Sequence, residues 1–234
     1  GLFTCNEQFG ADASSLFNVI TGYSRPPEYK HFIVAPHGMR SFFEYMIRQE
    51  TENAKKGLPS GITVKVNSLV DPKIIELLYE ASKAGVRVQL IVRGICCLIP
   101  GIEGVSENIT VMSIVGQLLE HSRIFRFENA GNPRIYMGSA DWMPRNLDRR
   151  VELVFPIEDE TQKARAFGIL DTMLSDTTNA RFMQSDTSYE HVDLRGKKKI
   201  SSQLTFYHEA QARLKELQSI EKDSVLIPIH SAEE

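Results

Sequence analysis

The sequence has few of the residues that mark a disulfide framework or a zinc site. Its 234 residues include three cysteines, Cys5, Cys96 and Cys97, and no Cys-x-x-Cys or Cys/His spacing. An odd count with an adjacent pair argues against a set of paired bridges. We therefore expect free, buried thiols in a reducing compartment, the cytoplasm.

Long apolar runs and a strong net charge are also missing. The longest apolar stretch, residues 86–100, is interrupted by Arg87, Gln89, Arg93 and Gly94, so nothing predicts a membrane span. The net charge is only −3, so a bound polyanion would need a local cluster of cations. There is no signal peptide and no initial Met, and we expect a piece of a longer protein.

What is present predicts a folded α/β domain. With 42% hydrophobic and 24% charged residues, the chain can bury a core. Apolar alternation and β-branched runs predict strands at residues 31–35, 62–66, 86–92, 109–114, 124–127, 134–137 and 151–155. Helical periodicity predicts helices at residues 41–56, 71–83, 158–174 and 201–219, the second capped by Asp71 and Pro72. The opening strand–helix–strand–helix–strand order favours parallel α/β packing.

The first stretch that could carry chemistry contains His121, just before a strand, and Arg123 two positions later. Residues two apart on an extended chain point the same way, so we expect both side chains to face one pocket. Such a pair suits a phosphoryl group, because imidazole can transfer a proton or accept phosphorus while guanidinium neutralises oxygen charge. Taken alone, however, such a histidine is more often structural.

A second stretch, Gly138-Ser139-Ala140-Asp141, follows the strand at residues 134–137. Small residues at a strand end let backbone amides approach a ligand, and Ser139 adds a donor. Asp141 could cap the next turn. An ordinary turn with a helix cap explains the same residues.

Further basic and polar residues are candidates for one anion site. Arg93 ends an apolar strand, where α/β sheets place ligand contacts, and it needs a carboxylate or a bound anion as partner. Lys65 and Asn67 share a face at another strand end. Arg145 and Arg149 lie in an arginine-rich stretch that favours a polyanion channel. An internal ion pair for Arg93 and a solvated surface for the others remain the alternatives.

Together these motifs resemble two related families. His-x-basic followed by Gly-Ser-x-Asp resembles a half-site of the phospholipase D superfamily, whose pattern is His-x-Lys and Gly-Ser-x-Asn; Arg123 and Asp141 depart from it. From about residue 2 to 219 the chain resembles the C-terminal domain of polyphosphate kinases, on residues 67–71, 90–94, 114–116, 119–123 and 139–146. This resemblance implies an α/β fold with a phospholipase-D-like mixed sheet flanked by helices. It implies a domain at residues 32–219, preceded by the end of another catalytic domain and a linker at 1–31, and followed by a loose tail at 220–234.

The second resemblance also implies a function: reversible transfer of the terminal phosphate of ATP to polyphosphate, through a phosphohistidine in an absent preceding domain. Arg93 and His121 would bind phosphate, with His121 catalytic, and the polyphosphate contacts would be Lys65, Asn67, Arg123, Ser139, Arg145 and Arg149. Mg²⁺ would be bound mainly by the absent domain and the phosphates, with no metal ligand in this chain. The chain alone would be inactive, and residues 9–20 would pack on the absent domain.

The resemblance further implies ATP, ADP and polyphosphate as partners, a homo-oligomer and peripheral membrane association, with no nucleic acid. Three alternatives remain. The first is a phospholipase-D-like phosphodiesterase or nuclease, which would be assembled as a dimer. The second is a non-catalytic module that binds a polyanion through its arginines. The third is an α/β interaction domain in which His121 is structural.

Overall fold

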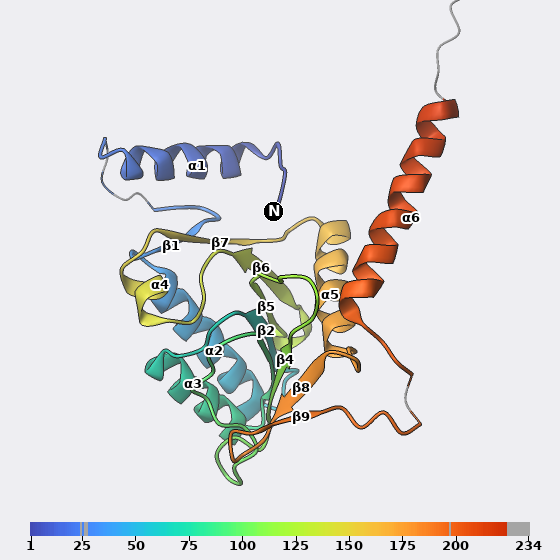
Figure 1. The fold of residues 1–234 in the computed structure, drawn as a ribbon. Helices are drawn as coiled ribbons and strands as arrows, with labels where there is room; N and C mark the ends of the chain where they lie inside the picture. Colours follow the sequence, from blue (N-terminus) through green and yellow to red (C-terminus); the bar gives the residue numbers. More distant parts are fainter. Residues whose placement is uncertain (24, 26–27, 197, 224–234) are drawn as a thin grey trace, which may run out of the picture.

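The computed structural model describes residues 1–234 except 24, 26–27, 197 and 224–234 (Figure 1). Within these residues one mixed sheet has the strand order β1-β7-β6-β5-β2-β3-β4-β8-β9. The strands are β1 Ile33–Ala35, β2 Gly61–Val66, β3 Arg87–Val92, β4 Ile109–Ile114, β5 Ile124–Phe127, β6 Arg134–Gly138, β7 Glu152–Pro156, β8 Ala180–Met183 and β9 Tyr189–His191. The helices are α1 Glu7–Ile20, α2 Met39–Lys55, α3 Pro72–Lys83, α4 Pro144–Asp148, α5 Glu160–Leu174 and α6 Ser202–Asp223, with a short 3-10 turn, η1, at Asn129–Gly131.

The expected mixed sheet flanked by helices is confirmed. Strands β2 and β3 are parallel neighbours, as the opening pattern predicted. Strand β4 also pairs parallel with β3, and all other pairs of these strands are antiparallel. The prediction of parallel packing was wrong for β1, which lies at the sheet edge and pairs antiparallel with β7. Local periodicity could not reveal this, because the partner of β1 lies more than 100 residues further along the chain.

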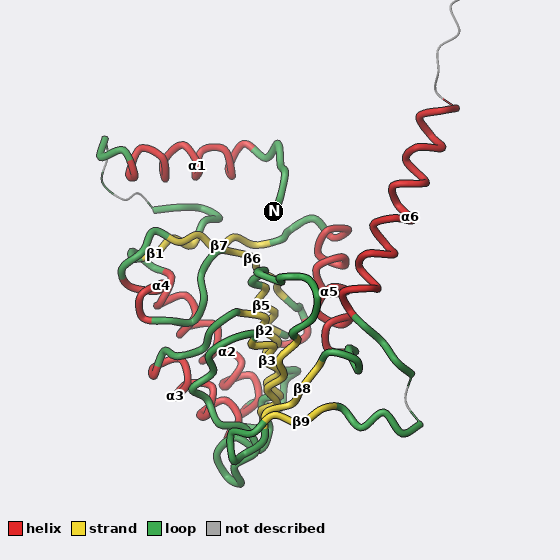
Figure 2. The backbone as a smooth tube through the Cα atoms, in the orientation of Figure 1, coloured by secondary structure: helices red, strands yellow, loops and turns green. Residues whose placement is uncertain are grey.

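The sheet is covered on both faces (Figure 2), with α2 and α3 on one side and α5 on the other. Val64 and Val66 of β2 belong to the larger core cluster, which includes Phe43 of α2 and Leu78 of α3. The opposite face carries a smaller cluster around α5, which includes Ile91 of β3. Side chains alternate along a strand, so Lys65 points to the face that Ile91 occupies.

The predicted bounds of most strands and helices agree with those in the structure to within two residues. Asp71 caps α3 as expected, its side chain accepting from the backbone N–H of Ile74 at 3.0 Å, with Pro72 in the first turn. The structure adds α1, α4, β8 and β9, which were not predicted, and α6 continues to Asp223. Most of the expected tail, residues 224–234, lies outside the described residues. The three cysteines are free, as expected, but the prediction that they are buried was wrong, because Cys5 and Cys97 are exposed and Cys96 is half-buried. None of the described helices has the length and apolar character that crossing a bilayer requires.

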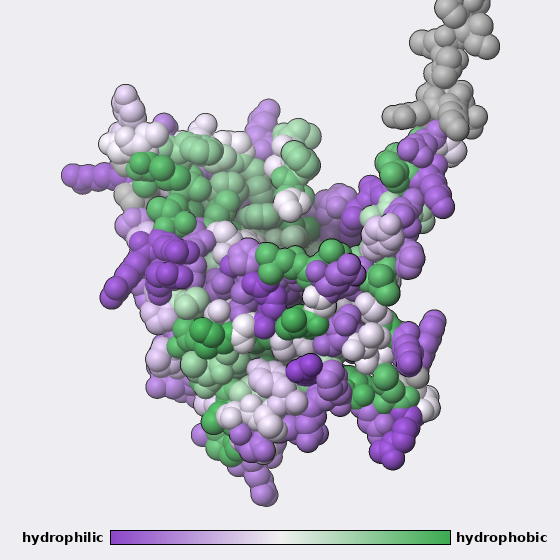
Figure 3. Space-filling model, in the orientation of Figure 1, coloured by the Kyte–Doolittle hydropathy of each residue, from purple (hydrophilic) through white to green (hydrophobic). Residues whose placement is uncertain are grey.

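Helix α1 is bonded to residues 30–32, the segment that precedes β1. The buried carboxylate of Asp12 accepts hydrogen bonds from the backbone N–H groups of Lys30, His31 and Phe32 at 2.7–3.1 Å. Phe9 stacks on the His31 ring, with centroids 4.6 Å apart. The outer face of α1 remains exposed and apolar, with Phe17 and Ile20 as its large side chains, and an apolar surface gathers in this region in Figure 3.

Candidate functional site

The candidate site lies at the edge of the sheet where β2 and β3 end. These strands are parallel with Val66 opposite Val92, so the chain leaves both at the same edge. Strand β5 runs antiparallel to β2 with Ile124 opposite Lys65, which brings the loop before β5 to this edge too. The topology therefore places the loop residue His121 beside the residue that follows β3.

Arg93 and His121 converge at this edge, as the sequence predicted. Arg93 Nη2 lies 3.4 Å from His121 Nδ1, the imidazole is exposed and the guanidinium is half-buried. Because guanidinium can only donate, this contact requires an unprotonated Nδ1, which leaves Nε2 to carry the proton. Among the described residues Arg93 forms no ion pair, so its charge is available to an anion.

Burial and three nearby cations depress the basicity of the imidazole, Lys65 being the weakest of the three. Partial burial and the positive charges of Arg123 and Arg93 lower the pKa of His121 below its ordinary value. A lowered pKa means that protonation of His121 is completed only in more acidic solution. The ring is therefore neutral at neutral pH, the state in which it can exchange a proton with a phosphate oxygen.

An NMR titration of the His121 ring is expected to give a midpoint below about 6.5, the ordinary histidine value. Arg93→Gln should raise this midpoint because one neighbouring positive charge is lost. Arg87→Gln, at the exposed start of the same strand, should leave it unchanged. A midpoint at or above the ordinary value in the parent chain would contradict the assigned electrostatics.

Arg123 does not share a pocket with His121. The strand begins only at Ile124, so extended alternation does not govern residues 121–123. The Arg123 guanidinium instead forms two hydrogen bonds to the Asp141 carboxylate, at 2.8 and 3.2 Å. The two departures from the phospholipase D pattern thus pair with each other, and the charge of Arg123 is neutralised within the protein.

The sequence analysis expected Asp141 to cap the next turn, and this prediction was wrong. The N-cap of α4 is Met143, without a side-chain cap bond. Asp141 accepts instead from the backbone N–H groups of Asn67 at 2.7 Å and Ser68 at 3.3 Å. Burial acts to raise the pKa of Asp141, but the hydrogen bonds from Arg123 and Asn67 outweigh it, so the pKa lies below its ordinary value. This carboxylate therefore ties β2, β5 and the segment after β6 together.

Lys65 is not placed to contact a polyanion. Its side chain is 1% exposed, and its ammonium donates to the backbone carbonyls of Glu120 at 3.1 Å and Ser122 at 2.9 Å. Burial lowers the pKa of Lys65 to about 8, while the Glu120 carboxylate opposes that effect. Asn67 is buried as well, with its side-chain amide directed to Asp141 at 3.4 Å.

The small residues after β6 serve the sheet and make no opening for a ligand. A Cβ on Gly138 would lie 2.4 Å from the Leu153 carbonyl oxygen, so only glycine lets β6 approach β7 here. The Ser139 hydroxyl is bonded to the Glu152 carboxylate and receives the backbone N–H of Leu153 at 3.0 Å. The Ser139 hydroxyl thus has protein partners although the residue is exposed, and its expected contact with polyphosphate stays a prediction.

Arg145 and Arg149 lie at the start and just past the end of α4, and both are exposed. No interaction within the described part of the chain connects either side chain to Arg93 or His121. Both remain accessible to an anion from solvent.

Sequence reasoning gave no role to Glu120, although it precedes His121. Both oxygens of its carboxylate are buried without a hydrogen-bond partner in the described residues, and it favours the charged form of Lys65 more than the other acidic group, Asp141, does. The signal that could have found it is a lysine inside an apolar strand, which requires a nearby negative charge.

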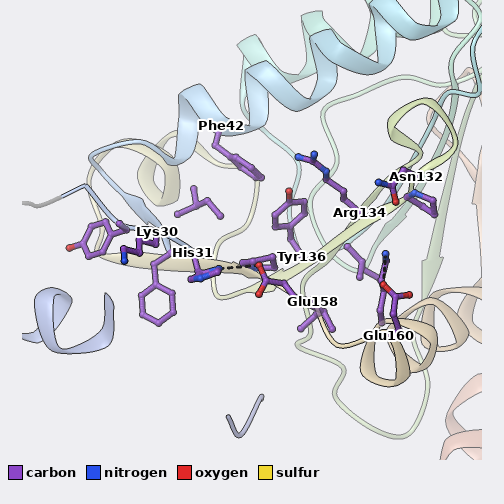
Figure 4. Close-up of a pocket in the computed structure, with 16 residues that line it drawn as sticks. Lys30, His31, Phe42, Asn132, Arg134, Tyr136, Glu158 and Glu160 are labelled. Carbon is purple, nitrogen blue, oxygen red and sulfur yellow. Dashed lines mark hydrogen bonds and ion pairs between the residues drawn. The ribbon is translucent and has the colours of Figure 1, made fainter. Parts of the chain in front are cut away.

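A hollow of about 590 Å³ lies away from this site, at the opposite end of β6 (Figure 4). Arg134 begins that strand and Gly138 ends it beside the Arg123 backbone, about 13 Å further on at 3.3 Å per residue. Two pairs of its lining residues are bonded to each other, His31 with Glu158 at 3.0 Å and Lys163 with Glu160 at 3.2 Å, while the lining residues Lys30 and Arg134 form no ion pair among the described residues. The hollow therefore takes no part in the arrangement around His121.

Comparison with known proteins adds independent information. Residues 32–203 match the family described as polyphosphate kinase C-terminal domain 2. The polyphosphate kinase of Lactiplantibacillus plantarum is 50% identical over 215 residues, 92% of this chain and 30% of that protein. That of Parasynechococcus marenigrum is 52% identical over 189 residues, 81% of this chain and 26% of that protein. The crystal structure of polyphosphate kinase from Porphyromonas gingivalis superposes with a TM-score of 0.86 at 35% identity, covering 90% of this chain and 32% of that one.

Proposed function

Because the chain belongs to the polyphosphate kinase family, matching its C-terminal domain 2, we propose that it supplies the phosphate-binding half of an ATP–polyphosphate phosphotransferase. The chain spans 26–30% of the length of the curated relatives described above, so the complete reaction is part of this proposal. The observation that carries it is the convergence of Arg93 and His121, with no carboxylate paired to Arg93 in the described residues.

The proposed reaction has two balanced steps. A histidine nitrogen in the preceding part of the enzyme attacks the γ-phosphorus of ATP, and the bond to the β-phosphate oxygen breaks as ADP leaves with the electron pair. A terminal oxygen of polyphosphate then attacks the phosphohistidine, the phosphorus–nitrogen bond breaks, and the chain is one phosphate longer. Both steps reverse when ADP and polyphosphate are in excess.

In this scheme Arg93 binds oxygens of the transferred phosphoryl group through charge-assisted hydrogen bonds. His121 exchanges a proton with the leaving or entering oxygen, for which its neutral ring is suited. Arg145 and Arg149 are the exposed cations that could follow a longer polyphosphate. Lys65, Asn67 and Arg123 are assigned to the support of the site, because each is already bonded within the protein.

Mg²⁺ belongs to the proposal as a partner of the phosphates. Among the described residues no group of three His, Cys, Asp or Glu side chains could hold a metal ion. The Asp141 carboxylate near the site is occupied by Arg123 and two backbone amides. These residues do not form a metal site, so the ion would be held by the phosphates and by the preceding domain.

Other parts of the proposal concern partners and location. The exposed apolar face of α1, with Phe17 and Ile20, is a suitable contact for the preceding domain of the same enzyme. A homo-oligomer, peripheral membrane association and a cytoplasmic location stay predictions.

A chimera tests the proposed function. The segment of the L. plantarum enzyme that matches this chain is replaced by the chain itself, which is 50% identical to it over 215 residues. Purified chimera is expected to form acid-insoluble polyphosphate from ATP, whereas the 234-residue chain alone should form none, because it lacks the nucleophilic histidine. A folded but inactive chimera, or synthesis by the chain alone, would refute the assignment.

The phosphodiesterase alternative is disfavoured by the Arg123–Asp141 pair, which occupies the cation that a diester site would need. Hydrolysis of bis(p-nitrophenyl) phosphate by the isolated chain, lost in His121→Ala, would revive it. A module that only binds polyanions would retain polyphosphate binding in His121→Ala and lose it in Arg145→Ala with Arg149→Ala.

A further inference from the structure

Three consecutive backbone carbonyls around His121 are each bonded to a cation. Lys65 Nζ donates to the carbonyl oxygens of Glu120 and Ser122, at 3.1 and 2.9 Å. Arg123 Nη1 donates to the carbonyl of His121 itself, at 2.8 Å. Charge-assisted hydrogen bonds are among the stronger ones in proteins, so this segment cannot rotate without losing several of them.

The burial of Lys65 calls for an explanation. Lysine is almost never fully buried unless it is paired, yet this side chain is 1% exposed and forms no ion pair shorter than 4.0 Å in the described residues. Its position on β2 lies opposite Ile91 and Ile124, where an apolar side chain would pack without desolvating a charge. The ammonium instead reaches past the end of the strand to the loop that carries His121.

We propose that Lys65 is a positioning residue, whose ammonium fixes the backbone on both sides of His121 and so sets the direction of the imidazole toward Arg93 and the phosphate. This inference rests on the proposed function for its catalytic consequence, although the geometry it describes belongs to the chain alone. Lys65 itself does not touch the substrate.

The contacts explain why two bonds from one lysine would matter. The His121 backbone lies between the two carbonyls that Lys65 binds, so loss of the ammonium releases the segment on both sides. The contact between Arg93 Nη2 and His121 Nδ1 is already 3.4 Å long, and a small displacement would break it. A misplacement of about 1 Å at a reacting group can lower a rate by about 100-fold.

The buried Glu120 carboxylate complicates a single substitution. Lys65→Met keeps the length of the side chain but leaves Glu120 without a compensating charge. The double variant Lys65→Met with Glu120→Leu removes both charges, so neither is left buried without the other. In this double variant the hydrogen bonds to the two carbonyls are lost, but no uncompensated charge is left behind. It therefore tests the effect of those hydrogen bonds alone.

The first measurement is an NMR spectrum of the His121 ring in the 234-residue chain. We expect Lys65→Met, and the folded double variant, to shift or broaden the ring signals. The second measurement is steady-state kinetics in the L. plantarum chimera, where kcat should fall by about 10- to 100-fold while KM for ATP changes little. Lys65→Met added to His121→Ala should cause no further loss.

Lys73→Met is the matched control, because this lysine is exposed on α3 and pairs with Glu76. It should change neither the ring signals nor kcat. A folded double variant with parental ring signals and parental kcat would overturn the inference, as would an additive loss in the His121→Ala background. If the chimera makes no polyphosphate, the proposed function fails, yet the NMR result still decides whether Lys65 positions His121.

Discussion

His121→Ala in the chimera is expected to lower polyphosphate synthesis by about 1,000-fold, within the range of about 10²–10⁴ that general acid–base catalysis contributes. The variant removes the group that exchanges a proton with the phosphate oxygen and also the partner of Arg93 Nη2. Initial rates with ATP and a short polyphosphate primer, measured in both directions, test the expectation. The reverse reaction should fall equally, since each of the two steps passes through the same transition state in both directions.

Stability should not explain that loss. The His121 side chain is exposed, so its truncation opens no cavity in the core, and the melting temperature should stay close to that of the parent. His208→Ala, on the exposed surface of α6, is the matched control and should leave the rate unchanged. Parental turnover in the His121→Ala chimera would remove this residue from the proposed chemistry.

The second large effect concerns folding. Asp141→Ala is expected to lower the free energy of unfolding by about 3–5 kcal/mol, because it leaves a nearly buried charge without its partner. The Arg123 and Asp141 side chains are only 10% and 9% exposed, so little solvent can replace the lost carboxylate. The backbone N–H groups of Asn67 and Ser68 also lose their acceptor. Urea unfolding of the isolated chain measures the change.

Asp148→Ala is the control for that experiment. Asp148 is 41% exposed, and its partner Arg40 keeps a second carboxylate, Asp71, at 2.6 Å, so the expected loss is below about 1 kcal/mol. Adding Arg123→Met to Asp141→Ala should recover part of the stability, because it removes the buried guanidinium that has lost its carboxylate partner. Equal losses of unfolding free energy for Asp141→Ala and Asp148→Ala would show that the Arg123–Asp141 pair stabilises the fold no more than the exposed pair does.

Much of the fold could be predicted from the sequence, because its strands and helices depend on local signals, whereas the contact between Arg93 and His121 was implied by the family resemblance. β-branched runs and apolar alternation located seven strands, and Asp71-Pro72 marked the start of α3. The rule that α/β sheets place ligand contacts at the carboxyl ends of parallel strands located Arg93. That rule needs only strand order and the position of a charged residue. It does not apply to His121, which precedes the antiparallel strand β5, and the pairing of the two residues was implied by the family resemblance.

What could not be predicted depends on partners distant in sequence. Lys65, Arg123 and Ser139 have the side chains of phosphate ligands, and their neighbours along the chain do not reveal that each is already bonded. Their partners are 13 to 57 residues away and meet them only through the antiparallel pairing of β5, β6 and β7. Residue type thus identified the basic groups, and topology decided which of them remain open to an anion.

The attachment of α1 through Asp12 bears on how this protein should be trimmed for laboratory work. The family match begins at residue 32, which suggests an obvious place to cut. A shortened protein starting there would lose the carboxylate that holds the segment before β1, and would uncover Phe32 next to a strand at the sheet edge. Unprotected edges recruit other chains, so such a product would tend to precipitate. Crystallisation and binding work should therefore retain the first thirty-one residues, even though they fall outside the recognised family boundary.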